Sequence, residues 1–267
     1  MNIMENITLE ESISAAMEDF DTKLIKYYPY ILQDFWEIGT SPDEIIKLIK
    51  KHKQNHSKLS ILDLGSGKGA VSIKISAELK CKCFGIDGLE DFVNYSNNKA
   101  KEYSVDNICT FEKNDIRIRI KTLGKYDIII LGAIGPVLGD FCSTLSLLQD
   151  HLSKDGLVII NEGYTEDGCI TDYPNVLQKN IIIKQINNAG MEIIDIITED
   201  EIPEKTEDFE NEVSNLEKRC MELIAKYPED KKLFLKYIEN QKDLYKKLDS
   251  EVISAIFIIK ALRTFWG

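Results

Sequence analysis

A glycine-rich turn is the segment of this chain best suited to bind a ligand. Residues 61–69 read ILDLGSGKG, so an apolar stretch leads into glycines at positions 65, 67 and 69. Glycine allows a sharp turn and lets a ligand lie against the backbone. The free amides at the start of the helix that follows would then face that ligand. The segment predicts a strand, a tight turn and a helix around a bound cofactor.

Two further carboxylates follow the next two predicted strands. Asp87 ends the strand 81–86, and Asp115 follows the strand 107–113. A carboxylate about twenty residues after a glycine-rich turn can accept both hydroxyls of a ribose. An acid after the third strand can receive the exocyclic amine of an adenine. Because ligands bind at the carboxyl ends of the strands in open α/β sheets, we expect these groups to lie close together.

Three nucleotide-type ligands could bind at a turn of this kind. A phosphate-binding P-loop is excluded, because Gly67 and Lys68 are followed by Gly69 and position 62 is a leucine. A nicotinamide site stays open, because Gly65, Gly67 and Ala70 match the G-x-G-x-x-A pattern and Asp87 matches its ribose acid. S-Adenosylmethionine (SAM) is the third candidate.

Five segments, in order, resemble the motifs of the class I SAM-dependent methyltransferases. DLGSGKG at 63–69, GID at 85–87 and ND at 114–115 resemble their first three motifs, and YDIIIL at 126–131 and LSKDGLVII at 152–160 resemble their fourth strand and the approach to the fifth. The strand 252–262, which follows a helical insertion, resembles their seventh, antiparallel strand. The leading helices and the insertion resemble a bacterial subgroup that acts on small molecules.

This resemblance implies a fold and an activity. The fold is a doubly wound α/β domain with a seven-stranded, mostly parallel sheet and an antiparallel last strand. The activity is methyl transfer from SAM to a small-molecule acceptor. The alternatives are an NAD(P)-dependent oxidoreductase, for which an all-parallel sheet is expected, and a non-catalytic SAM-binding protein. An enclosed cavity beside Gly132 would count against the non-catalytic alternative.

The resemblance also implies roles for ten residues. Gly65, Ser66 and Gly67 pass beside the carboxypropyl and ribose parts of SAM, and Asp63 orders the turn and the amino group. Asp87 accepts the ribose hydroxyls. The remaining five flank the adenine, bind its edge or border the reactive methyl: Gly88, Leu89, Asp115, Ile116 and Gly132.

No catalytic residue is identified by the sequence, since positioning alone can accelerate a methyl transfer. The segment GAIGP at 132–136 lacks the Asn/Asp-Pro-Pro-aromatic motif of DNA-amino and protein-glutamine methyltransferases. Glu162 and Tyr164, after the fifth strand, are candidates on the acceptor side, with an ordinary loop role as the alternative. Tyr28 is a third candidate, in an aromatic helix that either forms a lid or packs on the core. His52, His56 and His151 are expected to be non-catalytic.

The elements around these residues follow from hydrophobic periodicity. Helices are expected over 9–36 and 41–53, the second introduced by the start signal Ser41-Pro42-Asp43-Glu44. Strands and helices then alternate over 60–198, including helices over 141–152 and 175–189. Two polar helices over 209–226 and 229–248 precede the last strand. The expected divisions are an N-terminal helical segment, the cofactor-binding core, an insertion that covers the site or makes a homodimer contact, and the last strand: 1–58, 59–199, 200–249 and 250–267.

The composition of the chain indicates which classes of partner and which cellular compartment to expect. The formal net charge of −12 repels phosphate backbones, so nucleic acid is not expected as a partner. No apolar run reaches the roughly 20 residues of a membrane span, and the first residues do not form a signal peptide. We therefore expect a cytoplasmic protein that does not bind membranes. The six scattered cysteines and three histidines show no ligand spacing, so no metal site is expected.

Overall fold

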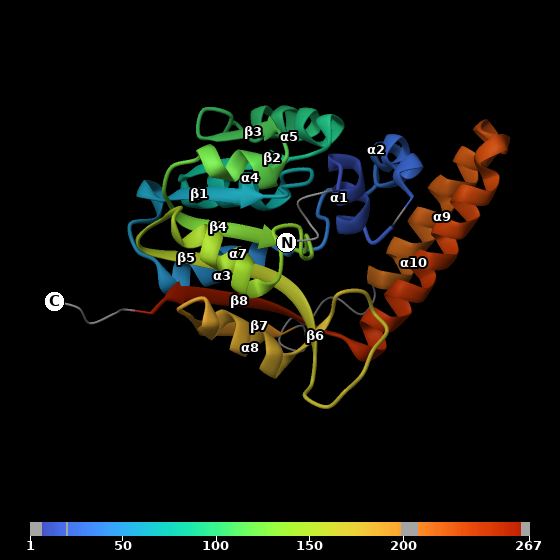
Figure 1. Cartoon of the computed structure of the whole chain (residues 1–267). Coiled ribbons are helices and arrows are strands. Elements are labelled where there is room, and N and C mark those ends of the chain that lie inside the picture. Colours follow the sequence, from blue (N-terminus) through green and yellow to red (C-terminus); the bar gives the residue numbers. More distant parts are fainter. Residues whose placement is uncertain (1–6, 20, 199–207, 263–267) are drawn as a thin grey trace.

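One sheet, covered by helices on both faces, forms the body of the molecule in a computed structural model (Figure 1). The structure describes residues 7–19, 21–198 and 208–262. The strand order is β3-β2-β1-β4-β5-β8-β7, with a short β6 paired to β5. The strands are β1 (Ser60–Leu64), β2 (Lys82–Asp87), β3 (Cys109–Lys113), β4 (Tyr126–Gly132), β5 (Leu152–Thr165), β6 (Leu177–Gln178), β7 (Met191–Thr198) and β8 (Ile253–Ala261).

Helices connect these strands and add two units outside the sheet. The α-helices are α1 (Leu9–Ala16), α2 (Tyr28–Ile31), α3 (Pro42–His52), α4 (Ala70–Leu79), α5 (Glu90–Glu102), α6 (Ile116–Arg119), α7 (Phe141–Gln149), α8 (Lys179–Asn188), α9 (Asp208–Lys226) and α10 (Lys231–Glu251). The 3-10 helices are η2 (Thr22–Tyr27), η3 (His56–Lys58), η4 (Ile120–Thr122) and η6 (Pro228–Asp230).

The direction of β8 confirms the predicted fold class. β8 runs antiparallel to both of its neighbours, β5 and β7, whereas β1 to β5 are mutually parallel. The all-parallel sheet expected for a nicotinamide-dependent oxidoreductase is therefore wrong for this chain. The sheet also has one strand more than predicted. That strand, β6, is only two residues long and pairs with Tyr164 and Thr165 at the far end of β5.

Alternation along the strands builds the core on both faces of the sheet. Ile61 of β1 packs with α3, α4 and α5, whereas its neighbour Leu62 packs on the other face with α7 and α8. Successive strand side chains point to opposite faces, so a strand with apolar residues at every position must be covered twice. The helices on both faces of the sheet meet this requirement. The carboxyl ends of the parallel strands then lie together at one edge of the sheet.

The periodicity predicts one helix over residues 9–36, but the structure does not form a single helix there. We call residues 7–19 and 21–36 the N-terminal cap. Within it, α1 ends at Ala16, and Glu18 then takes a left-handed φ of 53° that cannot continue a right-handed helix. The next helix, η2, begins after Asp21, whose side chain caps it by accepting a hydrogen bond from the amide of Lys23. The cap therefore turns on itself over the carboxyl edge of the sheet (Figure 1).

The start of α3 follows its sequence signal only in part. Ser41 is the N-cap and Pro42 is the first helical residue, as predicted, but the Ser41 side chain makes no capping hydrogen bond. The Glu44 side chain accepts a hydrogen bond from Lys47 at 2.6 Å instead of bonding to the backbone of the N-cap residue Ser41. A proline at the first turn and acids beside the helix N-terminus are enough to start the helix.

The insertion folds as a helical hairpin, α9 and α10, that projects from the sheet and packs on the N-terminal cap (Figure 1). A third apolar cluster joins the two units, with Tyr28 of α2 and Phe234 of α10 both fully buried in it. Arg219 of α9 holds Asp34 through two hydrogen bonds of 2.6 and 2.7 Å. Most of the acidic stretch 199–212 lies outside the described residues.

Three boundaries differ from the predictions. α7 ends at Gln149 and β5 starts at Leu152, so His151 lies in a turn rather than in a helix. β5 is 14 residues long because its end is paired by both β8 and β6. α8 starts only at Lys179, after β6. Over the ranges that the structure describes, no helix is long and apolar enough to cross a membrane.

Candidate active site

A cavity of about 150 Å³ lies at the carboxyl edge of the sheet, between the sheet and the N-terminal cap. Its walls come from the loop after β1, the ends of β2, β3 and β4, and α1 of the cap. All ten residues predicted to bind the cofactor line it: Asp63, Gly65, Ser66, Gly67, Asp87, Gly88, Leu89, Asp115, Ile116 and Gly132. The structure thus brings these residues together, while their individual roles stay predictions.

The glycine-rich loop takes the sharp turn that its sequence predicted. Gly65 and Gly67 have φ values of 73° and 51°, in the left-handed region that side chains rarely adopt. A Cβ on Gly65 would lie 2.5 Å from the side chain of Ile134, whereas a Cβ on Gly67 would meet nothing within 4 Å. The backbone of Gly67 therefore faces open space in the cavity, as a loop that cradles a ligand must.

Asp87 is held in place by the backbone around it. Its two carboxylate oxygens accept hydrogen bonds from the amides of Gly67 (2.8 Å) and Leu89 (2.9 Å). Burial raises the pKa of Asp87 to about 6, although these amide bonds oppose the shift. A carboxylate oriented by amides, with lone pairs left over, is suited to accept hydroxyl groups from a ligand.

Asp63 is a second buried acid in the same cavity. Its Oδ2 accepts a hydrogen bond from the hydroxyl of Ser72 at 2.7 Å. Burial raises its pKa to about 6; the Ser72 hydrogen bond opposes this shift, and the charge of Asp87 adds to it. Two buried, mutually repelling carboxylates favour a ligand that carries positive charge on the side facing them.

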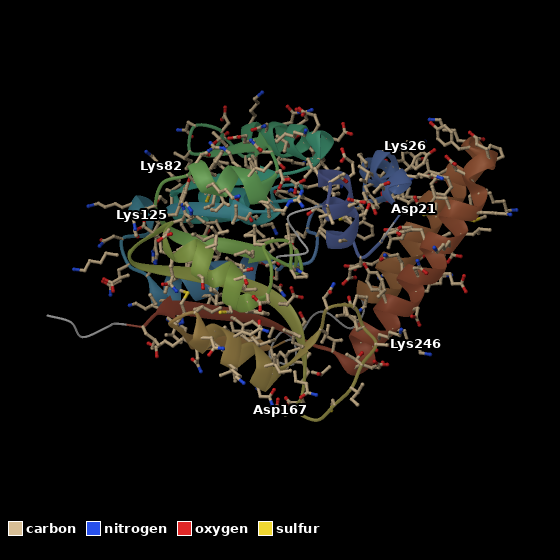
Figure 2. The ribbon with its side chains drawn as sticks, viewed as in Figure 1. Asp21, Lys26, Lys82, Lys125, Asp167 and Lys246 are labelled. Atoms are coloured by element: carbon tan, nitrogen blue, oxygen red, sulfur yellow. The ribbon has the colours of Figure 1, made fainter. Side chains whose placement is uncertain are left out.

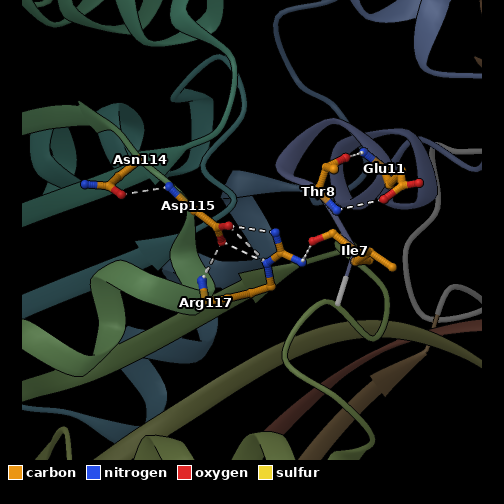
Figure 3. A network of polar contacts seen from close by, with 6 residues as sticks. All are labelled: Ile7, Thr8, Glu11, Asn114, Asp115 and Arg117. Atoms are coloured by element: carbon orange, nitrogen blue, oxygen red, sulfur yellow. Dashed lines mark hydrogen bonds and ion pairs between the residues drawn. The ribbon is translucent and has the colours of Figure 1, made fainter. Parts of the chain in front are cut away.

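Asp115 is engaged in a way that the sequence did not predict (Figure 3). Asp115 caps α6, because its side chain accepts a hydrogen bond from the amide of Arg117. The guanidinium of Arg117 also donates hydrogen bonds to both carboxylate oxygens of Asp115, at 2.7–3.1 Å. Arg117 also donates to the carbonyl of Ile7, beside the capping box of α1. Burial raises the pKa of Asp115, but Arg117 lowers it more, and the net shift is downward. Asp115 therefore ties the cap to β3 while it lines the cavity.

Lys68 is a site residue that sequence reasoning missed. Its ammonium is buried and donates hydrogen bonds to the carbonyls of Leu32 and Phe35, just after α2. The Lys68 carbonyl in turn accepts a hydrogen bond from the indole of Trp36 at 3.1 Å. Burial lowers the pKa of Lys68 to about 8. A lysine inside a glycine-rich turn was the available signal, but its partners are more than thirty positions away.

Two hydroxyl groups in the cavity wall lack protein partners. The side-chain oxygens of Ser66 and Thr40 are buried without a hydrogen-bond partner, and both residues line the cavity. The Thr40 hydroxyl lies 2.7 Å from where a Cβ on Gly132 would be. Buried hydroxyls are normally satisfied, so these two suggest a ligand that supplies the missing groups. This chemistry fits a cofactor with a ribose and an amino-acid tail.

The three acceptor-side candidates lie outside the cavity wall, and two of them are core residues. Tyr164 is buried and packs on Phe257, with ring centroids 6.1 Å apart. Tyr28 is fully buried in the apolar cluster of the cap and insertion. Glu162 directly follows Asn161, whose carbonyl accepts a hydrogen bond from the cavity residue Ala133 at 3.0 Å. Burial raises the pKa of Glu162 to about 7.

The histidines have structural partners. His52 lies 2.6 Å from Asp195 of β7, and His56 and His151 each lie within hydrogen-bond distance of a backbone carbonyl. The six cysteines are free thiols. Within the described ranges, no group of three or more His, Cys, Asp or Glu side chains is placed to hold a metal ion.

Comparison with known proteins gives one family match and several distant structural matches. A family model described as a methyltransferase domain matches residues 55–261. The protein-lysine N-methyltransferase EFM4 of Saccharomyces cerevisiae is 36% identical over 121 residues, which are 40% of this chain and 53% of that protein. The match thus spans about half the length of that curated relative.

Among solved structures, a SAM-dependent methyltransferase from Thiobacillus denitrificans, in complex with S-adenosylhomocysteine (SAH), has a TM-score of 0.72 at 15% identity. The match covers 88% of this chain and 98% of that one. The [4+2]-cyclase SpnF has a TM-score of 0.66 at 13% identity, over 90% of this chain and 95% of its own. Because a cyclase shares the fold, the fold alone does not determine the reaction.

The sheet order, the antiparallel β8 and the cavity at the carboxyl edge define a Rossmann-like α/β protein with a nucleoside-type cofactor site. The family model covers most of the chain, and the chain therefore belongs to the methyltransferase-domain family. Solved structures of the same fold hold SAH, the product that SAM leaves after methyl transfer.

Proposed function

We propose that this methyltransferase transfers the methyl group of SAM to a small-molecule acceptor that binds beside Gly132, under the N-terminal cap. SAM supplies an electrophilic methyl group on a sulfonium centre. The observation that carries the proposal is the convergence of the glycine-rich loop, Asp63, Asp87 and Gly132 on one cavity. A cavity that includes Gly132 also argues against a non-catalytic SAM-binding protein.

The covering of the site supports a small acceptor. Five residues of α1 or its C-cap line the cavity, and the α9–α10 hairpin packs on the N-terminal cap. A site covered by this cap suits a molecule that can be enclosed, because exclusion of water strengthens electrostatic contacts there. The resemblance to a bacterial small-molecule subgroup points the same way.

A lysine side chain of a protein is the second candidate acceptor. It is favoured by the similarity to the yeast protein-lysine N-methyltransferase, although that match covers 40% of this chain. A long, thin lysine side chain can enter a site that a folded domain cannot. The two candidates differ in the size of the acceptor.

Calorimetric titration of the purified protein with SAM, SAH and NADH tests the cofactor site. We expect micromolar binding of SAM and SAH and none of NADH. Binding of NADH alone would overturn the proposal, since the site residues would then serve a nicotinamide cofactor.

Transfer of a labelled methyl group tests the acceptor. The protein would be incubated with methyl-labelled SAM and a cell extract, and the extract then separated into a low-molecular-weight filtrate and precipitated protein. Label in the filtrate supports the small-molecule acceptor. Label confined to one or a few protein bands overturns it in favour of the lysine candidate.

A further inference from the structure

The hydroxyl group of Thr40 is an open polar group at the end of β4. Thr40 is 3% exposed and lines the cavity, and its Oγ1 has no hydrogen-bond partner in the protein. This Oγ1 lies 2.7 Å from the position that a Cβ on Gly132 would take. The absence of a side chain on Gly132 therefore leaves room for the hydroxyl, at the end of the cavity where the methyl group is expected.

A strained turn holds Thr40 in this position. The amide of Thr40 donates a hydrogen bond of 3.0 Å to the carbonyl of Ile38, and Gly39 between them has a φ of 77°. These are the marks of a γ-turn with a left-handed central residue, which is a rare and strained form. A Cβ on Gly39 would lie 2.8 Å from the Cβ of Ala133, which itself has a left-handed φ of 55°. Strained backbone on both sides of one contact is typical of a functional site.

The surroundings of Thr40 favour an anionic group. The helix α3 starts directly after it, with Ser41 as the N-cap, and the Ser41 side chain makes no capping hydrogen bond. The start of an α-helix carries a partial positive charge and attracts anions. The acids of the first turn, Asp43 and Glu44, are not among the described residues of the cavity wall. A buried hydroxyl donor next to a helix N-terminus is suited to bind a carboxylate.

Two other donors in the cavity wall serve different purposes. The ammonium of Lys68 already donates to two carbonyl groups of the N-terminal cap. The hydroxyl of Ser66 is open, but it lies 2.8 Å from the position of a Cβ on Gly85 in β2, and β1 separates β2 from β4. Because Asp87 ends β2, Ser66 lies on the side where the ribose is expected. Thr40 lies on the side of the methyl group.

We propose that the Thr40 hydroxyl binds the carboxylate of the amino-acid tail of SAM. This inference rests on the proposed function and names a further cofactor-binding residue. The sulfonium sulfur carries both the methyl group and the tail, so a residue beside the methyl group is also within reach of the tail. The ammonium of the tail suits the side of Asp63, where a second negative charge would be repelled. The carboxylate then faces Thr40 and the start of α3.

Calorimetric titration with SAH and with methylthioadenosine tests this assignment. SAH has the same tail as SAM, whereas methylthioadenosine keeps the nucleoside and the sulfur and has a methyl group in place of the tail. Thr40→Val keeps the shape of the side chain and should weaken SAH binding about tenfold or more, the scale of a lost hydrogen bond to a charged group. Its affinity for methylthioadenosine should be unchanged. Thr40→Ser, which restores the hydroxyl, should bind SAH nearly as wild type does.

Thermal denaturation gives a readout that a purely structural role of Thr40 would not give. Without ligand, Thr40→Val should be at least as stable as wild type, because the variant removes a buried hydroxyl that has no partner. SAH should then raise the Tm of wild type more than that of the variant. Thr144→Val is the matched control. The buried Thr144 hydroxyl donates to the carbonyl of Gly139, so that variant should lose stability and keep its SAH affinity.

Unchanged SAH affinity in Thr40→Val overturns the inference, even where methyl transfer falls, because the hydroxyl would then serve the acceptor. Equal weakening of SAH and methylthioadenosine binding also overturns it, since the tail would not be involved. A Thr40→Ser protein that binds SAH as weakly as Thr40→Val has the same consequence. Wild-type protein that binds both ligands equally rejects the tail contact and leaves the nucleoside site intact. Wild-type protein that binds neither ligand rejects the proposed function itself.

Discussion

At the scale of single residues, the site is built from carboxylates kept away from water. Asp63, Asp87 and Glu162 all have raised pKa values because burial disfavours their charged forms. Buried carboxylates of this kind lower the stability of the folded protein at neutral pH. They occur typically at functional sites, where a bound ligand offsets this loss. Asp63 and Asp87 line the cavity, whereas Glu162 lies outside its wall, directly after the strand partner of Gly132.

Replacement of Asp87 by asparagine should weaken SAH binding. The variant keeps the shape of the side chain but loses the charged acceptor between the amides of Gly67 and Leu89. The expected loss is about 1.5–3 kcal/mol, the scale of a hydrogen bond to a charged group. Calorimetry measures it, with the exposed Asp91→Asn as the matched control. Unchanged SAH affinity in a folded Asp87→Asn protein would contradict the assigned role.

Replacement of Glu162 by glutamine should stabilise the protein in a pH-dependent way. The folded-state pKa is raised from 4.5 to about 7, so the folded protein binds a proton that the unfolded chain releases. Stability from this group is complete below the unfolded pKa and is lost as the pH rises through about 7. The variant removes that loss and should gain up to about 3 kcal/mol at high pH.

Urea denaturation at about pH 8 and about pH 5 measures this effect for Glu162→Gln against wild type. The gain in the free energy of unfolding should be clear at the higher pH and largely gone at the lower. Glu166→Gln, with an exposed side chain, is the control and should show little change at either. A gain of equal size at both pH values would show that Glu162 does not titrate as inferred.

At the scale of elements, the N-terminal cap and the cofactor loop are joined as one unit. Lys68 and Trp36 hydrogen bond across the boundary from both sides, and Arg117 ties the start of α1 to Asp115. The cap is therefore fastened to the glycine-rich loop and to the end of β3. A change that loosens the N-terminal cap should therefore also loosen the glycine-rich loop.

Replacement of Lys68 by methionine should loosen this junction. Methionine keeps the apolar stem but removes the ammonium that donates to the carbonyls of Leu32 and Phe35, and the Leu32 carbonyl then keeps only its hydrogen bond from the Phe35 amide. Loss of a partner for buried polar groups costs about 1–3 kcal/mol in the free energy of unfolding. Limited proteolysis should cut residues 21–36 faster than in wild type. Lys82→Met, on the exposed side of β2, is the control; equal cleavage of both variants would argue against the junction.

At the scale of the whole molecule, the N-terminal cap and the α9–α10 hairpin pack together, and we call these two units the cover. The cap and the α9–α10 hairpin share an apolar cluster, and the hairpin lies at the carboxyl edge of the sheet, far from its opposite edge. Figure 2 shows Lys82 and Lys125 at that opposite edge, and Asp21, Lys26 and Lys246 around the cover. The net charge of −12 favours cationic over anionic partners in general.

Replacement of Phe234 by alanine should loosen both units of the cover. Phe234 is fully buried and meets Tyr27 of the cap edge-on, with ring centroids 4.8 Å apart. Removal of a buried phenyl ring costs about 3–5 kcal/mol. Hydrogen exchange should therefore speed up in η2 and α2 together with α10. Leu235→Ala, at an exposed position, is the control; loss of protection in α10 alone would mean that the two units are independent.

The sequence alone predicted the cofactor class, the fold class and ten of the residues that line the cavity. The reason is local: a strand, a glycine-rich turn and a helix are encoded by neighbouring residues, and parallel strands must bring their carboxyl ends to one edge. Asp63, Gly65 and Asp87 could be selected because each lies at a fixed distance from a strand end. The antiparallel β8 was predictable only through resemblance.

Only the tertiary structure decided which distant residues meet. Lys68 meets Leu32, and Arg117 meets Ile7, through space, and no periodicity or spacing encodes such contacts. The break in the first helix at Glu18 likewise depends on packing, because a left-handed residue other than glycine or asparagine carries little local signal. The glycine-rich loop is encoded by neighbouring residues, whereas the cavity also takes its wall from α1, far away along the chain, and only the tertiary structure brings the two together.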